Sequence, residues 1–181
     1  MVFVLSWPTD EDLGMLRRMP KGKLLKLFFL HIKNLWRVDG LYFLGIEAKF
    51  GTEAATEIDA DCWRIMGKIE ARGIREALGI KKNDVEALIQ ALSGTSWALY
   101  QIEKEYEVSP QQGIYRVVKC RTQETRLRKG LREFPCKQVR LGYLQSFARE
   151  FNPDIEVVCR VCPPDIRPEG KWCEWVFTIR K

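Results

Sequence analysis

The spacing of apolar residues changes near residue 94, and this change limits what the chain can fold into. From Lys23 to Phe50, apolar residues recur at intervals of three and four, as they do on one face of an α-helix. From Trp97 to Val108, apolar and polar residues largely alternate, which is typical of a strand. Helices followed by strands predict the α+β class, with the N-terminal helices packed on one face of an antiparallel sheet.

Residues that start and stop helices divide the first half. Thr9 and Asp12 form a variant of the capping box, which predicts a short helix after Thr9. Gly51 ends the long apolar segment, and Thr52 can cap the next helix, which we expect to run to about residue 78. Gly79 is suited to end that helix, because glycine readily takes the left-handed conformation that follows many helices.

The remaining elements follow from the same signals. Asn83 with Glu86 predicts the start of a helix through about residue 92, and Gly94 closes the helical half. In the second half, segments rich in proline, glycine and asparagine separate the periodic stretches. The sequence predicts strands over residues 97–108, 114–120, 155–161 and 172–179, and helices over residues 123–129 and 136–151.

Length and composition predict one globular domain. The chain has 181 residues, of which 46% are hydrophobic and 30% are charged. We expect a single domain over residues 1–181, with a helical half (1–94) and a strand-rich, cysteine-containing half (95–181). No apolar run approaches the roughly 20 residues that cross a bilayer. Residues 1–5 are apolar, but the acidic residues that soon follow do not suit a signal peptide. We therefore expect a cytoplasmic protein without membrane attachment.

The net charge of +6 is concentrated in one segment. Between Lys119 and Arg140 there are eight basic residues against Glu124 and Glu133. Such a stretch can attract an anionic ligand or an acidic partner, or it can be a solvated helix face. It has neither interleaved aromatic residues nor a recognisable DNA-binding motif, so we expect no specific nucleic-acid binding.

The cysteines are the most informative residues for function. Cys62 lies mid-helix beside Trp63, and we expect it to be a small core residue. The other five all follow residue 119. They are Cys120, Cys136, Cys159, Cys162 and Cys173.

The positions of these five predict that several of them meet. Cys136 follows Pro135 at a helix start, where free backbone N–H groups favour a thiolate. Cys159 and Cys162 form a CxxC at the end of a strand, and Cys173 opens the strand that should pair with it. We expect Cys162 and Cys173 to be neighbours, Cys136 to be the third member, and Cys120 or Cys159 to complete the set.

Four thiolates suit zinc or an iron–sulfur cluster, because they are soft and anionic and can complete a tetrahedral site. A single CxxC is only moderately specific, since no second CxxC balances it as in a zinc ribbon. Two other interpretations remain open. The thiols can form a redox-active pair, or they can be inert reduced cysteines without metal.

His31 and Asp39 are the candidate proton-transfer residues. His31 is the only histidine and lies on the apolar stripe of its predicted helix, so it is either a hydrogen-bonded core residue or a catalytic group facing a pocket. No HExxH, GxSxG or phosphate-binding loop pattern is present. A serine-hydrolase or phosphate-cradling role therefore has no support.

Several segments resemble a known prokaryotic family. They are residues 31–44, 50–55, 120–123, 134–136, 162–165 and 172–175. Together they resemble an uncharacterised family grouped near the L-2-amino-thiazoline-4-carboxylate hydrolases. The closing pattern of Cys162, Gly170, Cys173 and Phe177 is similar to the end of the 4-vinyl reductase (V4R) small-molecule-binding domain. The resemblance implies N-terminal helices, an antiparallel sheet and a pocket between them.

Two functions follow. The first is a small-molecule-binding or sensing domain whose cysteines ligate zinc or an iron–sulfur cluster. The second is a hydrolase of a C–N bond in a small cyclic substrate, with His31 or Asp39 moving protons, as the resemblance to the aminothiazoline carboxylate hydrolases implies. We favour the first, because no acid–base constellation stands out and a four-cysteine site is normally closed. A homodimer is a further arrangement that we keep open.

Overall fold

The computed structural model describes residues 7–179, so the apolar residues 1–5 lie outside the described part of the chain. The described chain forms two compact units, residues 1–39 and residues 40–181, and each is presented by itself. The boundary falls inside one long helical segment. None of the helices among residues 7–179 combines the length and the hydropathy needed to cross a membrane.

The first unit contains α1 (Asp10–Arg18) and the beginning of α2 (Lys21–Leu78). The predicted capping box at the start of α1 is confirmed. The Thr9 hydroxyl accepts a hydrogen bond from the backbone N–H of Asp12, and the Asp12 carboxylate accepts one from the backbone N–H of Thr9. No residue of α1 is buried.

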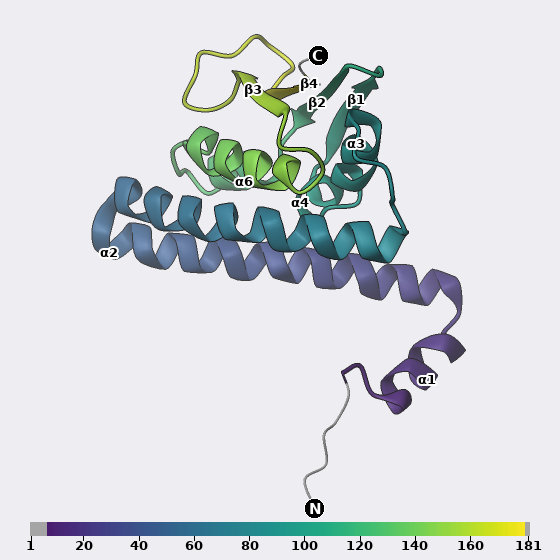
Figure 1. Cartoon of the computed structure of the whole chain (residues 1–181). Coiled ribbons are helices and arrows are strands. Elements are labelled where there is room, and N and C mark those ends of the chain that lie inside the picture. The colour runs from purple at the N-terminus through teal and green to yellow at the C-terminus, as the bar shows by residue number, and fades with distance from the viewer. Residues whose placement is uncertain (1–6, 180–181) are drawn as a thin grey trace, which may run out of the picture. The chain divides into compact units, whose positions relative to one another are not determined.

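In the second unit α2 is interrupted at Gly51, as predicted. Gly51 has φ 86° and ψ 166°, a conformation that side chains with a Cβ rarely adopt. Residues 40–50 and 52–78 are therefore two helical limbs, and the chain reverses its direction between them (Figure 1). The Thr52 hydroxyl donates to the Glu47 carboxylate at 2.9 Å, which ties the two limbs together at the turn.

Two short helices follow. α3 (Val85–Ser93) is capped by Asp84, whose carboxylate accepts from the backbone N–H of Ala87, so the predicted cap at Asn83 is wrong by one residue. α4 (Ser96–Tyr100) occupies the first part of the predicted strand 97–108. Thr95 caps α4 by accepting from the N–H of Ala98, and this signal outweighs the alternation of apolar residues.

The sheet is antiparallel throughout. Its strands are β1 (Glu103–Val108), β2 (Gln112–Lys119), β3 (Ile155–Val161) and β4 (Cys173–Ile179), in the spatial order β1-β2-β4-β3. α5 (Arg121–Arg128) and α6 (Lys137–Arg149) lie in the connection between the two strand pairs. The α+β class with helices on an antiparallel sheet is confirmed.

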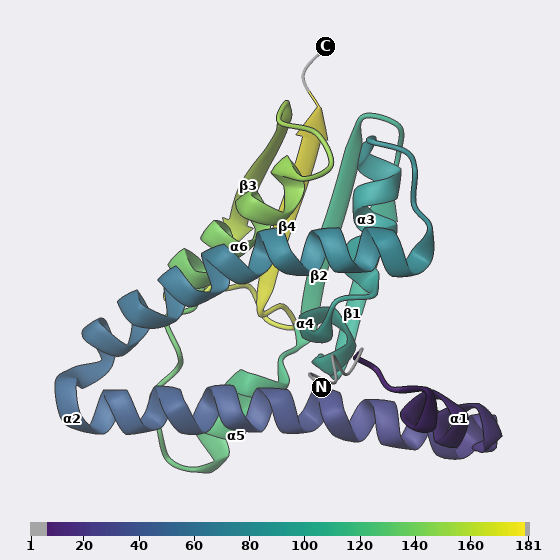
Figure 2. The same ribbon diagram turned by 60° about the horizontal axis from the view of Figure 1, so that its bottom comes forward.

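One face of the sheet carries helices (Figure 2). α6 packs on β3, and α3 packs on β1 and β2. Tyr115 and Trp175 lie directly opposite one another in β2 and β4 and are fully buried on this inner face. Because side chains alternate along a strand, the residues next to Tyr115 in β2 and next to Trp175 in β4 point to the outer face of the sheet.

The second limb of α2 packs against α6. A Cβ at Gly67 would lie 2.4 Å from the backbone oxygen of Tyr143, so only glycine permits this close approach. The Trp63 and Tyr143 rings meet edge to face at 5.7 Å, and the Tyr143 hydroxyl donates to Glu70 at 2.8 Å. The inner core thus has three layers, which are the sheet, α6 with α3, and the second limb of α2.

Candidate metal centre

Three elements of the second unit deliver four cysteines to one place. Cys136 is the N-cap residue of α6, Cys159 lies in β3, Cys162 directly follows β3, and Cys173 begins β4. The backbone N–H of Lys137 donates to the carbonyl oxygen of Pro163 at 3.0 Å, which fixes the start of α6 beside the segment that carries Cys162.

A β-bulge in β3 brings the two cysteines of the CxxC pattern to the same face of the sheet. Residues three apart normally point to opposite faces of a sheet. Cys159 pairs with Trp175 and Val161 pairs with Glu174, so Arg160 is an extra residue in β3. The bulge shifts the register by one residue, so that Cys162 comes opposite Cys173 and on the same inner face as Cys159.

Cys162 is the centre of the group, which we name the thiol cluster (Cys136, Cys159, Cys162 and Cys173). Its sulfur lies 3.5 Å from that of Cys136, and both side chains are buried. Hydrogen bonds with Cys136, then with Cys159 and Cys173, raise the pKa of the Cys162 thiol, and burial raises it further. The predicted contact between Cys162 and Cys173 is therefore present, and Cys136 is a member.

The Cys136 thiol is held by groups that favour its ionised form. The hydrogen bond from Cys162 is the main cause that lowers the pKa of Cys136, although burial acts in the opposite direction. The Arg140 guanidinium and the Gln123 amide lower it further, and the Gln123 amide nitrogen lies 3.6 Å from the Cys136 sulfur. Gln123 also donates to the carbonyl of Phe134 and accepts from its N–H, so it holds the loop before α6.

The surroundings of Cys159 also favour its ionised form. Its hydrogen bond with Cys162 lowers its pKa, the charge of Lys137 adds to this effect, and burial opposes it. The Lys137 ammonium is paired with the Asp165 carboxylate at 2.8 Å. Asp165 also accepts from the backbone N–H of Cys162 at 3.2 Å, which fixes the turn that follows the CxxC pattern.

Cys120 lies beside the thiol cluster but outside it. It is the N-cap residue of α5, and burial raises its pKa, with further contributions from nearby Cys136 and Cys173. Cys120 is not among the cysteines whose hydrogen bonds raise the pKa of Cys162. Of the two cysteines expected to complete the set, Cys159 is therefore the one in contact with Cys162.

A buried cation lies one turn beyond Cys136. Arg140 is only 5% exposed. Its guanidinium carbon lies 4.6 Å from the ring centre of Trp63 and 5.3 Å from that of Trp97. Its backbone N–H donates to the carbonyl of Cys136 at 2.9 Å. Cation–π contacts with two indole rings stabilise the charge away from water.

The other predicted site residues lie elsewhere. His31 is exposed, so the interpretation as a core histidine is wrong, and Asp39 is half-buried. Both belong to the first unit, whereas the thiol cluster belongs to the second. Cys62 is exposed on α2, so the prediction of a core residue is also wrong. On a helix, successive side chains are separated by about 100°, and Trp63 takes the inward position.

The basic stretch 119–140 is partly used inside the protein. Arg126 pairs with Glu47 at 2.9 Å and lies 5.4 Å from the ring centre of Phe43, so it fastens α5 to the limb 40–50. Arg121 donates to the carbonyl of Tyr100 at 3.0 Å. These contacts account for two of the basic residues, and the expectation of no specific nucleic-acid binding stays a prediction.

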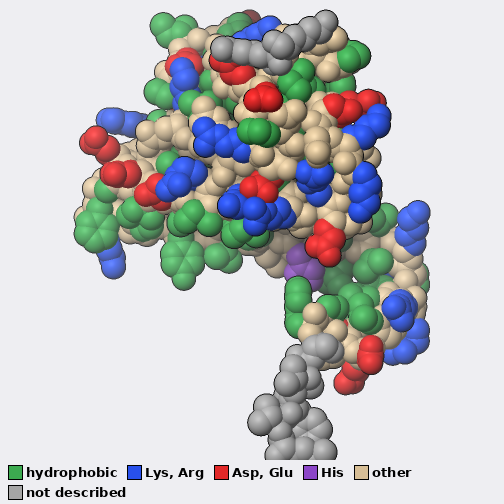
Figure 3. All heavy atoms as spheres, viewed as in Figure 1, with side chains coloured by type: hydrophobic (Ala, Val, Ile, Leu, Met, Phe, Trp, Pro, Cys, Tyr) green, Lys and Arg blue, Asp and Glu red, His purple; other side chains and the backbone are tan. Residues whose placement is uncertain are grey.

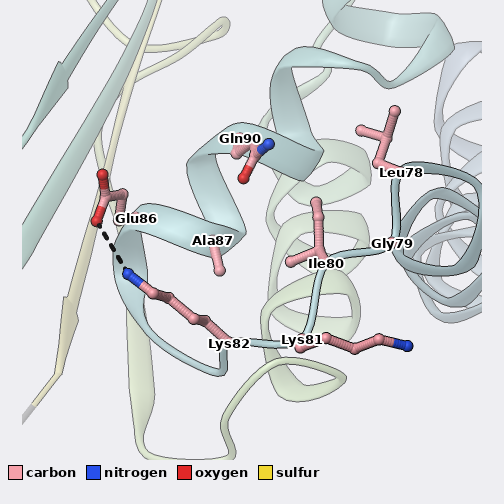
Figure 4. Close-up of a pocket in the computed structure, with 8 residues that line it drawn as sticks. All are labelled: Leu78, Gly79, Ile80, Lys81, Lys82, Glu86, Ala87 and Gln90. Carbon is pink, nitrogen blue, oxygen red and sulfur yellow. Dashed lines mark ion pairs between the residues drawn. The ribbon is translucent and has the colours of Figure 1, made fainter.

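A small open cavity of about 270 Å³ lies between the end of α2 and the start of α3 (Figure 4). Lys82 and Glu86 face one another across its edge at 3.9 Å, and both are well exposed. The lining residues are Leu78, Gly79, Ile80, Lys81, Lys82, Glu86, Ala87 and Gln90. The cavity contains none of the cysteines.

Two parts of the site escaped the sequence analysis. The bulge at Arg160 has no clear sequence signal, because it arises from the pairing of two strands. Gln123 could have been noticed, since it is an uncharged residue in the first turn of the basic helix α5, three residues after Cys120. Among residues 7–179, no group of three or more His, Cys, Asp and Glu side chains is placed so that it could hold a metal ion.

The fold and the thiol cluster define an α+β protein that gathers four free cysteines at one end of an antiparallel sheet. Residues 17–179, which include all of these cysteines, match a family of unknown function, DUF6125, and the chain belongs to this family. A comparison with curated proteins finds no match.

Proposed function

We propose that the protein binds a metal ion through the thiol cluster, and that this centre supports a small-molecule-binding or sensing domain. Zinc is the proposed metal, with an iron–sulfur cluster as the alternative. One observation carries the proposal. The Cys162 thiol interacts with three other cysteines that come from α6, β3 and β4.

The distance between two of the sulfurs is compatible with a tetrahedral site. In a four-thiolate zinc site with Zn–S bonds of about 2.3 Å, neighbouring sulfurs are separated by roughly 3.8 Å. The sulfurs of Cys136 and Cys162 are 3.5 Å apart, so this one pair lies close to the separation that such a site requires. As neutral thiols the side chains pack on one another through S–H groups. A metal ion would replace those protons and lie between the sulfurs.

The surrounding charges support an anionic centre. Four thiolates and a divalent ion carry two net negative charges, which are costly to bury without compensation. Lys137 lowers the pKa of Cys159, and Arg140 lowers that of Cys136. The Gln123 amide adds a donor to the Cys136 sulfur. This arrangement resembles the outer partners that orient metal ligands and tune them.

A closed four-cysteine site favours a structural or redox-responsive role over catalysis, because no position is left for water. Hydrolysis of a small cyclic C–N substrate therefore stays the alternative, with His31 and Asp39 as its untested proton-transfer residues. The proposal also implies a reducing compartment such as the cytoplasm, where thiolates remain available for metal.

The test is metal analysis of protein purified without oxygen. We expect about one zinc per chain, and cobalt(II) exchanged into the site should give the absorption of tetrahedral thiolate coordination. Cys162→Ser should lose the metal. Cys120→Ser and Cys62→Ser are matched controls, one beside the cluster and one on the surface, and both should keep it.

Two results decide against zinc. Iron and sulfide with a visible absorption band would identify the iron–sulfur alternative. Protein that contains no metal and takes up neither zinc nor cobalt(II) would overturn the proposal, as would full metal content in Cys162→Ser.

A further inference from the structure

Two sulfurs of the thiol cluster lie close enough to be joined by a small movement. The Cys136 and Cys162 sulfurs are 3.5 Å apart, although the residues are 26 positions apart in the chain. The hydrogen bond from the Lys137 N–H to the Pro163 carbonyl, one residue beyond each cysteine, holds the two segments side by side. A disulfide bond is about 2.05 Å long, so the sulfurs have to approach by about 1.5 Å. Small rotations about the two Cα–Cβ bonds act in this direction.

Cys162 is placed between two possible partners. It hydrogen bonds with Cys159 as well as with Cys136. The bulge at Arg160 turns Cys159 and Cys162 to the same face of the sheet. In thiol–disulfide exchange, a third sulfur attacks one sulfur of an existing disulfide, so the attacking sulfur has to lie next to that disulfide. The three sulfurs satisfy this requirement in the order Cys159, Cys162 and Cys136.

Solvent reaches one end of this series. Cys159 is partly exposed, whereas Cys136 and Cys162 are buried. Charged side chains of both signs are mixed over the surface above α2 (Figure 3), so the surface does not select a reagent of one charge. Because Cys159 is only partly exposed, a small molecule reaches its sulfur more readily than a large one. Hydrogen peroxide, which is small and uncharged, is the oxidant that fits these conditions.

We propose that the thiol cluster is a redox switch, in which hydrogen peroxide reacts at Cys159 and leaves a disulfide between Cys136 and Cys162. The Cys159 sulfur attacks one peroxide oxygen, the O–O bond breaks, and Cys159 becomes a sulfenic acid as water leaves. The Cys162 sulfur then bonds to the Cys159 sulfur and displaces the hydroxyl group, which leaves as a second water with the thiol proton of Cys162.

The last step moves the disulfide into the interior. The Cys136 sulfur attacks the Cys162 sulfur, the bond between Cys159 and Cys162 breaks, and the proton of Cys136 passes to the departing Cys159 sulfur. In the whole sequence, two thiols lose two protons and two electrons, and one peroxide becomes two molecules of water. Cys159 ends as a thiol again.

The consequence for metal rests on the proposed function. A disulfide between Cys136 and Cys162 removes two of the four proposed ligands, so the zinc ion should leave when the disulfide forms. The disulfide itself needs no metal. The switch is therefore tested first on the metal-free chain.

The experiment uses the full chain with Cys62→Ser, because the exposed Cys62 would otherwise cross-link two copies. Reduced, metal-free protein is treated with hydrogen peroxide, the remaining thiols are blocked with N-ethylmaleimide, and the protein is digested with trypsin. Trypsin cleaves after lysine and arginine, so Cys136, Cys159 and Cys162 fall in three different peptides. Mass spectrometry should show a Cys159–Cys162 link early and a Cys136–Cys162 link at the end, and dithiothreitol should reverse both.

Two variants complete the test. Cys159→Ser removes the exposed thiol, so the Cys136–Cys162 link should form at least ~10-fold more slowly. Cys120→Ser is the matched control, because Cys120 lies beside the thiol cluster but outside it, and this variant should oxidise at the rate of the parent protein. Circular dichroism verifies that each variant is folded. Thiols that oxidise only to sulfinic acid without a linked peptide would overturn the inference, as would Cys159→Ser protein that oxidises as fast as its parent.

Zinc separates the failure of this inference from the failure of the proposed function. Zinc-loaded protein should release about one zinc ion for each disulfide formed, which a chromogenic chelator measures. Protein that binds zinc but forms no disulfide would overturn the switch and leave the metal site in place. Protein that forms the disulfide but binds no zinc would support the switch and overturn the metal site.

Discussion

Cys173 and Glu174 are consecutive residues of β4, yet they serve two different clusters on opposite faces of the sheet. Cys173 joins the thiol cluster on the inner face, beneath the helices. Glu174 is 4% exposed and lies on the outer face among basic side chains. The two clusters therefore show two ways of burying ionisable groups in one strand.

The outer cluster is electrostatically complete. The Glu174 carboxylate is paired with Arg116, with Arg160 at 3.1 Å and with Lys171 at 2.7 Å. Burial alone would raise the pKa of Glu174, but the hydrogen bonds from Lys171, Arg116 and Arg160 outweigh it and lower the pKa to about 2. The protein itself supplies the cations that this buried carboxylate requires.

The inner cluster is different. Its acidic groups are four thiols, and the charges of Lys137 and Arg140 lower the pKa values of Cys159 and Cys136 without forming an ion pair with them. The hydroxyl of Tyr115 and the indole N–H of Trp175 are buried on the same face without a hydrogen-bond partner among the described residues. The comparison shows that Glu174 is surrounded by cations of the chain itself, whereas the thiols interact mainly with one another. The metal ion that we propose would supply a further cation to the thiol cluster.

The largest expected effect is that of Cys173→Ser. If the thiol cluster binds zinc, binding energy is folding energy, so the free energy of unfolding of the zinc-loaded protein should fall by about 4 kcal/mol. Denaturant titrations with and without a chelator measure it. The difference from wild type should nearly vanish once metal is removed, and Cys62→Ser should resemble wild type throughout. An equal loss with and without metal would contradict the comparison.

Glu174→Gln should have the next largest effect, about 3 kcal/mol, because three basic groups lose a buried carboxylate. Its effect should not depend on metal. Since the folded pKa is depressed, the stabilisation is present above the unfolded value near 4.5 and is lost as the pH falls toward about 2. Thermal unfolding across this pH range should show a steep dependence in wild type that is weaker in Glu174→Gln. A parallel dependence in both proteins would refute the assignment.

Gln123→Leu should cost about 2 kcal/mol, because the buried N–H and carbonyl of Phe134 lose their partner. This substitution also removes the amide donor to the Cys136 sulfur. We therefore expect weaker metal binding in a competition assay with a chromogenic chelator, together with the loss of stability. Unchanged metal affinity would show that Gln123 holds the loop but does not assist the thiol.

Tyr115→Phe should have the smallest effect, within about 1 kcal/mol and in the stabilising direction. Removing a buried hydroxyl without a partner relieves a desolvation penalty. Chemical unfolding of the two proteins provides the measurement. A clear destabilisation would mean that the hydroxyl has a partner outside the chain, such as a bound molecule, and would strengthen the small-molecule-binding part of the proposal.

Much of the fold was predictable because local signals dominate there. The Thr9 cap, the break at Gly51, the stop at Gly79 and the strand 155–161 all match the structure. Trp97–Tyr100 was predicted as a strand because alternating apolar residues fit either state, and the Thr95 cap was overlooked.

The sequence by itself determined the α+β class, the order of the elements and the region of the cysteines, since these depend on residue spacing and on turn residues. Only the tertiary structure decided which cysteines meet. Cys159 and Cys162 share a face because Arg160 bulges where β3 pairs with β4, and Cys136 reaches them because α6 begins beside Pro163. Both facts are relations between distant segments, and strand register and helix docking are set by the packing of the whole domain rather than by any local run of residues.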